Sequence, residues 1–144
     1  MKKKLVISTG AGISAESGIS TFRDTDGLWE KYPVMDVASA DGFARNPALV
    51  HEFYNARRKH LLTTEPNDAH RGLVDLEEYF DVQIITQNVD DLHERAGSAN
   101  ILHLHGELMK LRSEDNPELI YDIKGWEQSL DERAEDGALL RPHI

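Results

Sequence analysis

A glycine-rich turn near the N-terminus contains the first residues whose types and spacing could bind a ligand. Gly10, Gly12 and the small Ala15 follow a short apolar segment, residues 5–7, and match the Gly-x-Gly-x-x-Gly/Ala pattern of phosphate-binding turns. Glycines in such a turn let backbone N–H groups approach a pyrophosphate, and the N-terminus of a following helix adds partial positive charge. The same pattern also fits an ordinary joint between a strand and a helix.

The spacing after this turn argues against an ordinary dinucleotide-binding unit. Such a unit reaches its second strand within about 30 residues. Here the helical segment is cut short at the Ser-Gly pair 17–18, a loop with Phe-Arg-Asp at 22–24 follows, and the next clear strand is residues 82–86. A hydride-transfer dehydrogenase is therefore disfavoured.

A polar cluster with the sequence Gln-Asn-Val-Asp-Asp-Leu-His, residues 87–93, directly follows the apolar strand 82–86. In parallel α/β sheets, ligands bind just beyond the carboxyl ends of the strands, where this cluster is expected to lie. A second interpretation is that Asn88 and Asp90 cap a short helix, residues 91–96, which ends at a glycine. Both interpretations can hold at once.

A histidine follows the next predicted strand. Residues 100–104 form a short apolar strand, and His105 comes directly after it. In a parallel sheet His105 would lie beside the loop that begins at Gln87, while His103 points to the opposite face from Leu104. An imidazole with a pKa of about 6.5 suits proton transfer at neutral pH, so His105 is a candidate general base. From the residues alone, a structural histidine remains the alternative.

A tyrosine and an arginine lie three residues apart on a predicted helix. Asn46-Pro47 is a typical helix start, and the apolar period continues to about Leu62. Tyr54 and Arg57 therefore project from one face of this helix. The plainer interpretation of the spacing is a tyrosine at the edge of the apolar stripe, beside a solvated arginine.

Length and composition indicate one globular domain. The chain has 144 residues, of which 40% are hydrophobic and 29% charged. Its 26 acidic and 16 basic residues give a net charge of −10, which argues against nucleic acid as the main partner. The absence of cysteine excludes disulfides and thiolate metal sites. Because there is neither a secretory apolar segment nor a run of about 20 apolar residues, we expect a cytoplasmic protein without a membrane partner.

Several of these stretches, in this order, resemble the sirtuins, which are NAD-dependent protein-lysine deacylases. The resemblance begins with Gly-Ala-Gly-Ile-Ser at 10–14, Ser-Gly-Ile at 17–19 and Phe-Arg-Asp at 22–24. Gln-Asn-Val-Asp-x-Leu-His at 87–93 is similar to the family's nicotinamide and ribose contact motif, and Leu-His-Gly at 104–106 to its catalytic signature. The resemblance covers nearly all of this chain but only the first part of the family's domain.

Tyr-x-x-Arg at 54–57 resembles the signature of the sirtuin branch that removes negatively charged acyl groups. A succinyl or malonyl chain ends in a carboxylate, whereas an acetyl group does not. The resemblance therefore implies a desuccinylase or demalonylase in which Tyr54 and Arg57 bind the substrate's acyl chain. His70, in a second predicted helix at 69–78, has a sequence context also found in sirtuins and is expected to be structural.

The resemblance implies an α/β fold with a partial Rossmann-like parallel sheet and a small inserted helical and irregular module. Residues 1–144 would form the N-terminal part of a sirtuin catalytic domain: 1–26 and 80–106 the Rossmann-like core, 27–79 the cofactor loop and helices, and 107–140 the remnant of a zinc-ribbon module. Most sirtuins carry four cysteines in that module, but here Ser113 stands near the first position and the chain has no cysteine. No structural zinc is therefore expected.

The resemblance also implies a cofactor, a substrate and a reaction. NAD would be the cofactor, an acylated lysine of a protein or peptide the substrate, and nicotinamide and O-acyl-ADP-ribose the products. His105 would be the catalytic base that removes a proton from a ribose hydroxyl, and no metal is expected. The implied cofactor-binding residues lie in the first loop and in the polar cluster: Gly10, Ala11, Gly12, Ile13, Ser14, Ala15, Glu16, Ser17, Thr21, Phe22, Arg23, Trp29, Gln87, Asn88, Val89 and Asp90.

Two other functions remain open. A non-catalytic module would bind NAD or ADP-ribose without turnover, and a protein ADP-ribosyltransferase would attack the same ribose carbon with a protein acceptor. The family's later strands and adenosine-binding loops are absent from the sequence, which gives weight to the non-catalytic module and to a fragment of a longer protein.

Overall fold

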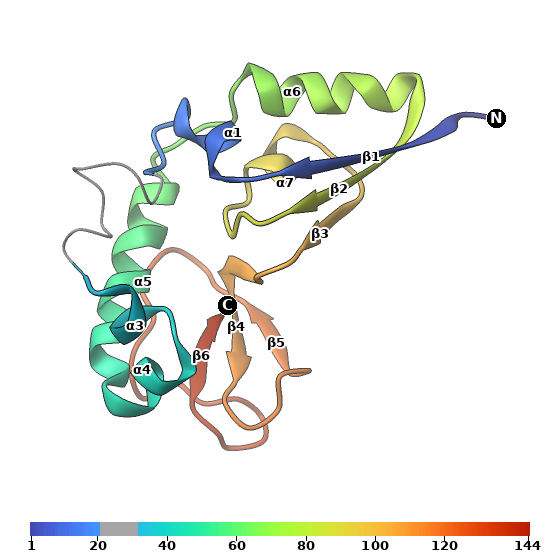
Figure 1. Ribbon diagram of the computed structural model, residues 1–144. Helices are drawn as coiled ribbons and strands as arrows, with labels where there is room; N and C mark the ends of the chain where they lie inside the picture. Colours follow the sequence, from blue (N-terminus) through green and yellow to red (C-terminus); the bar gives the residue numbers. More distant parts are fainter. Residues whose placement is uncertain (21–31) are drawn as a thin grey trace.

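Two small sheets and a set of helices make up residues 1–20 and 32–144, the parts of the chain that the computed structural model describes (Figure 1). The first sheet has three parallel strands in the order β1-β2-β3, and the second has three antiparallel strands in the order β5-β4-β6. Helix α6 lies along the first sheet, whereas α3, α4 and α5 lie beside the second (Figure 1). The predicted α/β class with a partial parallel sheet is confirmed.

The parallel strands end together at one edge of the first sheet. They are β1 (Lys3–Thr9), β2 (Phe80–Thr86) and β3 (Ile101–His103). The register places Thr9 beside Thr86 and Thr86 beside His103, so the segments that follow all three strands leave from the same edge. The three predicted strands are confirmed, but the third ends at His103, and Leu104 and His105 form a turn.

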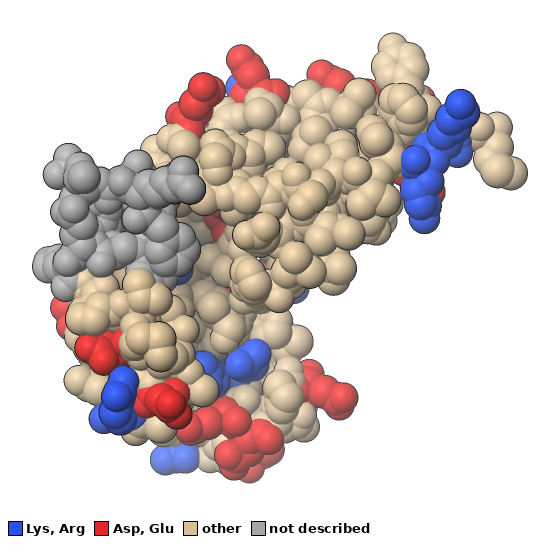
Figure 2. All heavy atoms as spheres, viewed as in Figure 1, with Lys and Arg blue, Asp and Glu red and all other residues tan. Residues whose placement is uncertain are grey.

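The two faces of the parallel sheet differ in burial. Val82 and Ile84 are buried on the face where the side chains of Thr9 and Thr86 meet helix α7. The helices next to that face are α6 (Asp68–Asp75), its 3₁₀ extension η1 (Leu76–Glu78) and α7 (Leu92–Ala96). On the opposite face Val6 is 55% and Leu102 52% exposed, and Figure 2 shows few charged side chains over this sheet.

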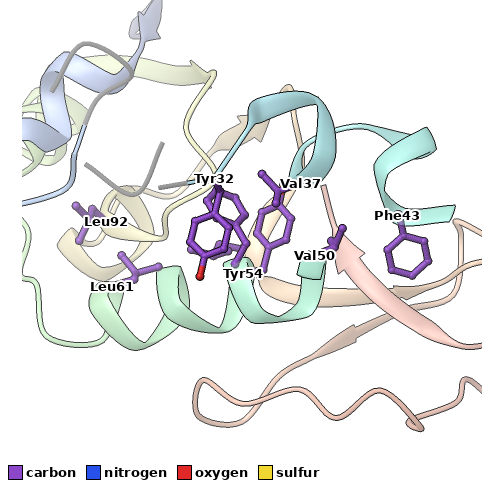
Figure 3. Close-up of a cluster of buried hydrophobic side chains, with 9 residues drawn as sticks. Tyr32, Val37, Phe43, Val50, Tyr54, Leu61 and Leu92 are labelled. Carbon is purple, nitrogen blue, oxygen red and sulfur yellow. The ribbon is translucent and has the colours of Figure 1, made fainter. Parts of the chain in front are cut away.

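The main core lies between α5 and the elements that surround it. Helices α3 (Val34–Val37) and α4 (Ala40–Arg45) precede the 15-residue α5 (Pro47–Leu61). The predicted start of α5 is confirmed, because the Asn46 side chain accepts a hydrogen bond from the backbone N–H of Leu49 at 3.2 Å. The core residues are Tyr32, Val37, Phe43, Val50, Phe53, Tyr54, Leu61, Leu92 and Leu108, most of them labelled in Figure 3. Of the helices within the described ranges, none combines the length and the apolar character needed to cross a membrane.

An arginine of α5 attaches this helix to the antiparallel sheet, which consists of β4 (Glu107–Ser113), β5 (Ile120–Asp122) and β6 (Leu140–His143). Arg58 has no exposed surface. Its Nε donates to the backbone oxygen of Leu108 and its Nη1 to Oδ1 of Asn55, both at 2.8 Å. Burial lowers the pKa of Arg58 to about 10, so its guanidinium is still charged at neutral pH.

A serine–aspartate contact holds the end of β4. The buried Ser113 hydroxyl donates to Oδ2 of Asp136 at 2.6 Å and accepts the backbone N–H groups of Asp115 and Asn116 at 3.2 and 3.1 Å. Oδ1 of Asp136 accepts the backbone N–H of Ala138 at 3.0 Å. This contact joins two loops at the position where the sequence resemblance places a zinc-binding cysteine.

Candidate functional site

The common edge of β1, β2 and β3 brings together three stretches that the sequence analysis singled out. Helix α1 (Ala11–Ala15) follows β1, the polar cluster 87–93 follows β2, and the turn with His105 follows β3. The backbone N–H of Gln87 donates to the oxygen of Thr9 at 3.0 Å, so the first two exits are hydrogen-bonded to each other. These stretches are far apart in the sequence but adjacent in the fold.

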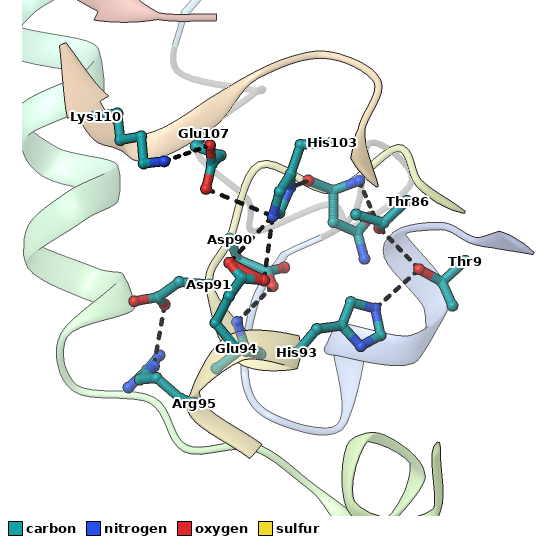
Figure 4. A network of polar contacts seen from close by, with 12 residues as sticks. Thr9, Thr86, Asp90, Asp91, His93, Glu94, Arg95, His103, Glu107 and Lys110 are labelled. Atoms are coloured by element: carbon teal, nitrogen blue, oxygen red, sulfur yellow. Dashed lines mark hydrogen bonds and ion pairs between the residues drawn. The ribbon is translucent and has the colours of Figure 1, made fainter. Parts of the chain in front are cut away.

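Polar side chains join the exits of β1 and β2 more tightly. Thr9 donates its hydroxyl to that of Thr86 at 2.8 Å, and Thr86 Oγ1 accepts the backbone N–H of Asn88 at 3.0 Å (Figure 4). The Asn88 side chain donates to the backbone oxygen of Gly10 at 2.9 Å. Asn88 therefore does not cap α7, which was one interpretation of the sequence, but ties the polar cluster to the glycine turn.

Asp90 of this cluster has a structural role as well. Its Oδ2 accepts the buried Ser14 hydroxyl at 2.8 Å, and its Oδ1 accepts the backbone N–H of Leu92 at 3.1 Å. Asp90 thus caps the first turn of α7, as predicted, and at the same time holds α1 in place. Both Ser14 and Asp90 are expected cofactor-binding residues, and in this structure each hydrogen-bonds the other.

The glycine turn is open toward the other described residues. Apart from its chain neighbours and the backbone of α1, a Cβ atom added at Gly10 or at Gly12 would meet no atom of the described residues within 4 Å. Helix α1 is as short as the sequence predicts, and Gly18 follows it with a positive φ of 96°. Most of the expected cofactor-binding residues here, Ala11, Gly12, Ala15 and Glu16, are exposed, whereas Ile13 and Ser17 are half-buried. Thr21, Phe22, Arg23 and Trp29, also expected to bind the cofactor, lie outside the described residues.

The candidate base, His105, is exposed in the turn after β3. The next residue, Gly106, has a φ of 89°, and a Cβ there would collide with the backbone oxygen of His143. Only glycine therefore suits this position. The glycine sets the course of the chain away from His105 and leaves its imidazole accessible at the edge of the sheet.

Two histidines are buried beneath the site. His93 on α7 lies with its Nε2 3.0 Å from the Thr9 hydroxyl, and its ring packs edge-on against that of His70 at a centroid distance of 5.1 Å. Nδ1 of His70 accepts the backbone N–H of Asn67 at 3.1 Å, which confirms its expected structural role. Burial lowers the pKa of both imidazoles, so both are neutral in the folded protein at neutral pH.

Tyr54 and Arg57 project from α5 as predicted, and both are more buried than their spacing alone indicates. Tyr54 is only 3% exposed and packs on Phe53 at 5.0 Å between ring centroids. The Arg57 guanidinium is half-buried and lies 5.5 Å from the centroid of the Phe53 ring and 5.7 Å from that of Tyr54. Burial lowers the pKa of Arg57, while the charges of Tyr54 and Asp90 act in the opposite direction. The arginine is therefore close enough to Asp90 to be influenced by the polar cluster.

Tyr54 also lines a cavity of about 160 Å³. It is lined by residues of α3, α4, α5, β4 and β6, among them Val37, Val50, Arg112 and Arg141. The Arg141 guanidinium stacks on the Phe43 ring at 4.6 Å, and burial lowers its pKa.

Comparison with known proteins agrees with the sequence resemblance. The model of the Sir2 family matches residues 10–143. This chain belongs to the Sir2 family. Curated relatives named NAD-dependent protein deacylase include proteins of Helicobacter pylori, 58% identical over 99% of this chain and 62% of the relative, and of Bacteroides thetaiotaomicron, 57% identical over 99% and 63%. The Sir2 chain thus spans somewhat less than two thirds of the length of these relatives.

Solved structures have the same fold. A Sir2 homologue in complex with NAD matches 98% of this Sir2 chain with a TM-score of 0.84 and 40% identity, and the chain covers 56% of that structure. A complex of a mutant Sir2 homologue with ADP-ribose matches with a TM-score of 0.85, 40% identity, and coverage of 98% and 57%.

One functional candidate of this Sir2 chain escaped the sequence analysis. His103 contacts Glu94 of α7 and Glu107 of β4, and the potential ligand atoms of these three side chains lie within 4.8 Å of one another. The imidazole already has a hydrogen-bond partner at each ring nitrogen, so it is occupied without a metal. The strand alternation of the sequence indicates only that His103 points to the face opposite Leu104. It does not indicate its partners, because α7 and β4 are brought to that face by the fold.

Proposed function

We propose that the protein is an NAD-dependent protein-lysine deacylase whose cofactor ribose and catalytic base lie at the common edge of β1, β2 and β3. The observation that carries the proposal is the in-register ending of these strands at Thr9, Thr86 and His103. Membership of the Sir2 family, and relatives named NAD-dependent protein deacylase, support it. Within the proposal, residues 1–26 and 80–106 are the Rossmann-like core, 27–79 the cofactor loop and helices, and 107–140 a zinc-ribbon module without zinc ligands.

The residues of the glycine turn suit a phosphate group. The open space at Gly10 and Gly12 admits a bulky ligand, and the exposed backbone of α1 provides N–H groups at its first turn. We assign cofactor binding to residues 10–17, to 87–90 and to Thr21, Phe22, Arg23 and Trp29. Bound NAD would supply both the ribose carbon that loses nicotinamide to the acyl oxygen and the ribose hydroxyl that receives the acyl group.

His105 then acts as the general base. Its exposed imidazole accepts a proton from a ribose hydroxyl at a ring nitrogen, which makes that oxygen a nucleophile. The ordered hydrogen bonds of Asn88 and Asp90 keep the neighbouring loop in one conformation. A fixed loop reduces the entropy lost when the reacting groups are brought together.

We further assign selection of the acyl chain to Tyr54 and Arg57. A half-buried guanidinium with a lowered pKa is poorly hydrated, which favours a carboxylate partner supplied by a succinyl or malonyl chain. An acetyl group has no carboxylate that could pair with this guanidinium. The substrate class is therefore an acylated lysine in a protein or peptide, and the negative net charge of −10 argues against nucleic acid as a competitor. We place the activity in the cytoplasm.

One assay tests the proposal. The intact protein is incubated with NAD and peptides that carry acetyl-, malonyl- or succinyl-lysine, and mass spectrometry follows the loss of the acyl mass and the release of nicotinamide. We expect NAD-dependent deacylation, which His105→Ala reduces by roughly 10²- to 10⁴-fold. Calorimetry with NAD on the same variant controls for folding and binding.

The other outcomes identify the competing functions. NAD binding by calorimetry without any loss of acyl mass would indicate a non-catalytic binding module. An ADP-ribose adduct on the peptide would indicate a protein ADP-ribosyltransferase. Undiminished turnover in His105→Ala would remove this residue as the base.

A further inference from the structure

His103 is a histidine whose two ring nitrogens both meet hydrogen-bond acceptors. Its side chain is only 6% exposed. Nδ1 lies 2.8 Å from the backbone oxygen of Asn88, and Nε2 lies 3.1 Å from each carboxylate oxygen of Glu94 (Figure 4). A second carboxylate, that of Glu107, is 3.8 Å from Nε2. The residue is therefore held between the polar cluster and helix α7.

This arrangement fixes the charge of the imidazole. A carbonyl oxygen and an ionised carboxylate can only accept hydrogen bonds, and a neutral imidazole carries a single N–H. Both contacts can form together only when both nitrogens are protonated. His103 is accordingly an imidazolium ion that donates one bond to Asn88 and one to Glu94.

The charges around His103 agree with this assignment. Burial by itself would lower the pKa of His103, but the hydrogen bonds to Glu94 and Asn88 and the charges of Glu94 and Glu107 outweigh it and raise the pKa. The other titratable groups that face it are His93 on α7, Lys110 on β4 and His143 on β6. Lys110 is paired with Glu107 at 3.0 Å, which weakens the effect of that carboxylate on the imidazole. Glu94 is therefore the main partner of the charge.

Asn88 is held by three hydrogen bonds, one of which comes from His103. The backbone N–H of Asn88 donates to Thr86, its side chain donates to Gly10, and its backbone oxygen accepts from His103. These three hydrogen bonds connect Asn88 to β2, the glycine turn and β3. Loss of the bond from His103 would free the carbonyl end of the residue that ties the polar cluster to the glycine turn.

We propose that protonated His103, held by Glu94, is a positioning residue that fixes Asn88 and thereby keeps the polar cluster 87–90 in the geometry needed for the cofactor ribose. It acts through Asn88 and contacts no reacting group itself. The catalytic consequence rests on the proposed deacylase function, whereas the fixation of Asn88 does not. Removal of the proton from His103 at high pH should release Asn88 and weaken NAD binding.

The first experiment measures the charge and the fixation without any turnover. Nitrogen NMR of the histidine rings in the intact protein, in buffer with EDTA, reports the protonation of His103, and hydrogen exchange reports the protection of the Asn88 amide. We expect both nitrogens of His103 to be protonated at pH 7. Glu94→Gln removes the charge but keeps the shape, so it should move the titration of His103 to lower pH and speed exchange at Asn88 roughly 10-fold.

The second experiment measures the consequence for the cofactor. We expect Glu94→Gln to raise the KM for NAD roughly 3- to 10-fold with a smaller change in kcat. In the unmutated protein this KM should rise as the pH passes upward through the pKa of His103, and in Glu94→Gln the rise should begin at lower pH. His103→Gln should have a high KM that does not follow this titration. Glu107→Gln should have a smaller effect than Glu94→Gln, and Glu65→Gln, an exposed residue before α6, should have none.

Contrary results are distinct for the two proposals. A neutral His103 at pH 7, or unchanged exchange at Asn88 in Glu94→Gln, overturns the positioning role whatever the assay shows. Faster exchange at Asn88 with an unchanged KM for NAD also overturns it, because the cofactor site would then be indifferent to the fixation. A protein that never consumes NAD would refute the deacylase proposal, while the NMR measurements would still decide the state of His103.

Discussion

The two sheets of this molecule differ in the kind of buried polar side chain that holds the elements beside them. At the edge of the parallel sheet the buried groups are His70, His93 and His103, whose charges change in the physiological pH range. At the antiparallel sheet the groups compared are Arg58 and Ser113, whose protonation is constant over that range, although His143 of β6 also has a pKa lowered by burial. The difference predicts that pH acts on the candidate site, whereas the contacts of Arg58 and Ser113 respond only to the loss of their hydrogen bonds.

The largest effect on stability is expected at Arg58. Arg58→Met keeps much of the volume but removes the donors to Leu108 and Asn55, so it should lower the free energy of unfolding by about 3 kcal/mol. Urea unfolding at pH 7.5 measures this. Arg71→Met is the control, since Arg71 forms an exposed ion pair with Asp68 and should change the value by less than about 0.5 kcal/mol. Equal losses in the two variants would show that Arg58 does not anchor α5.

The neighbouring arginine should affect selectivity. Arg57→Ala removes the group assigned to the acyl carboxylate, so kcat/KM for a succinyl-lysine peptide should fall roughly 10- to 100-fold while that for acetyl-lysine changes little. Tyr54→Phe should have a smaller effect in the same direction. Lys59→Ala, whose ammonium lies 5.1 Å above the Trp126 ring, is the matched control. Equal losses on both peptides would remove the assignment of Tyr54 and Arg57 to the acyl chain.

A smaller loss of stability is expected at Ser113. Ser113→Ala leaves the backbone N–H groups of Asp115 and Asn116 without their acceptor and should cost about 1–2 kcal/mol. Ser129→Ala, an exposed change in the same part of the chain, should have almost no effect. The loss in Ser113→Ala should be the same at pH 7.5 and pH 5.5. A loss that depended on pH would break the contrast between the two sheets.

The smallest effect is the response of the unmutated protein to pH. The pKa values of His70 and His93 are lowered in the folded state, so their contribution to stability is present above about pH 6.5 and is lost as the pH falls through the folded-state pKa. His103 has a raised pKa, so its contribution is present below about pH 6.5 and is lost as the pH rises through its folded-state pKa. Urea midpoints measured from pH 5 to 9 should therefore pass through a maximum. A midpoint that rose steadily toward pH 5 would contradict the neutral buried pair.

Much of the fold followed from local patterns in the sequence. The strands at 5–7 and 82–86, the cap at Asn46 and the end of α7 at Gly97 were predicted at nearly their observed positions. Apolar runs, side-chain caps and glycine are signals that act within a few residues. Helices α3 and α4 were missed, because each is under two turns long and has no apolar period of its own.

The candidate site followed from the sequence only in part. The topology expected for parallel strands was enough to place the glycine turn, the polar cluster and His105 at one edge. The burial of Tyr54 depends on Phe53 and on packing from other elements, and a spacing of three residues cannot report it. The contacts of His103 with Asn88 and Glu94 join three elements, so they appear only when the strands and α7 are in place.

The glycine after the candidate base has a mechanical consequence. Gly106 is the only residue between the His105 turn and β4, and its Cα faces the backbone of His143 too closely to admit a methyl group. Two residues further on, the N–H of Leu108 donates to the oxygen of Val89 at 2.8 Å. The chain between the two sheets is therefore short and held by close contacts on both sides. We therefore expect a shift of β4 or β6 to displace both the turn with His105, the candidate base, and the loop at Val89.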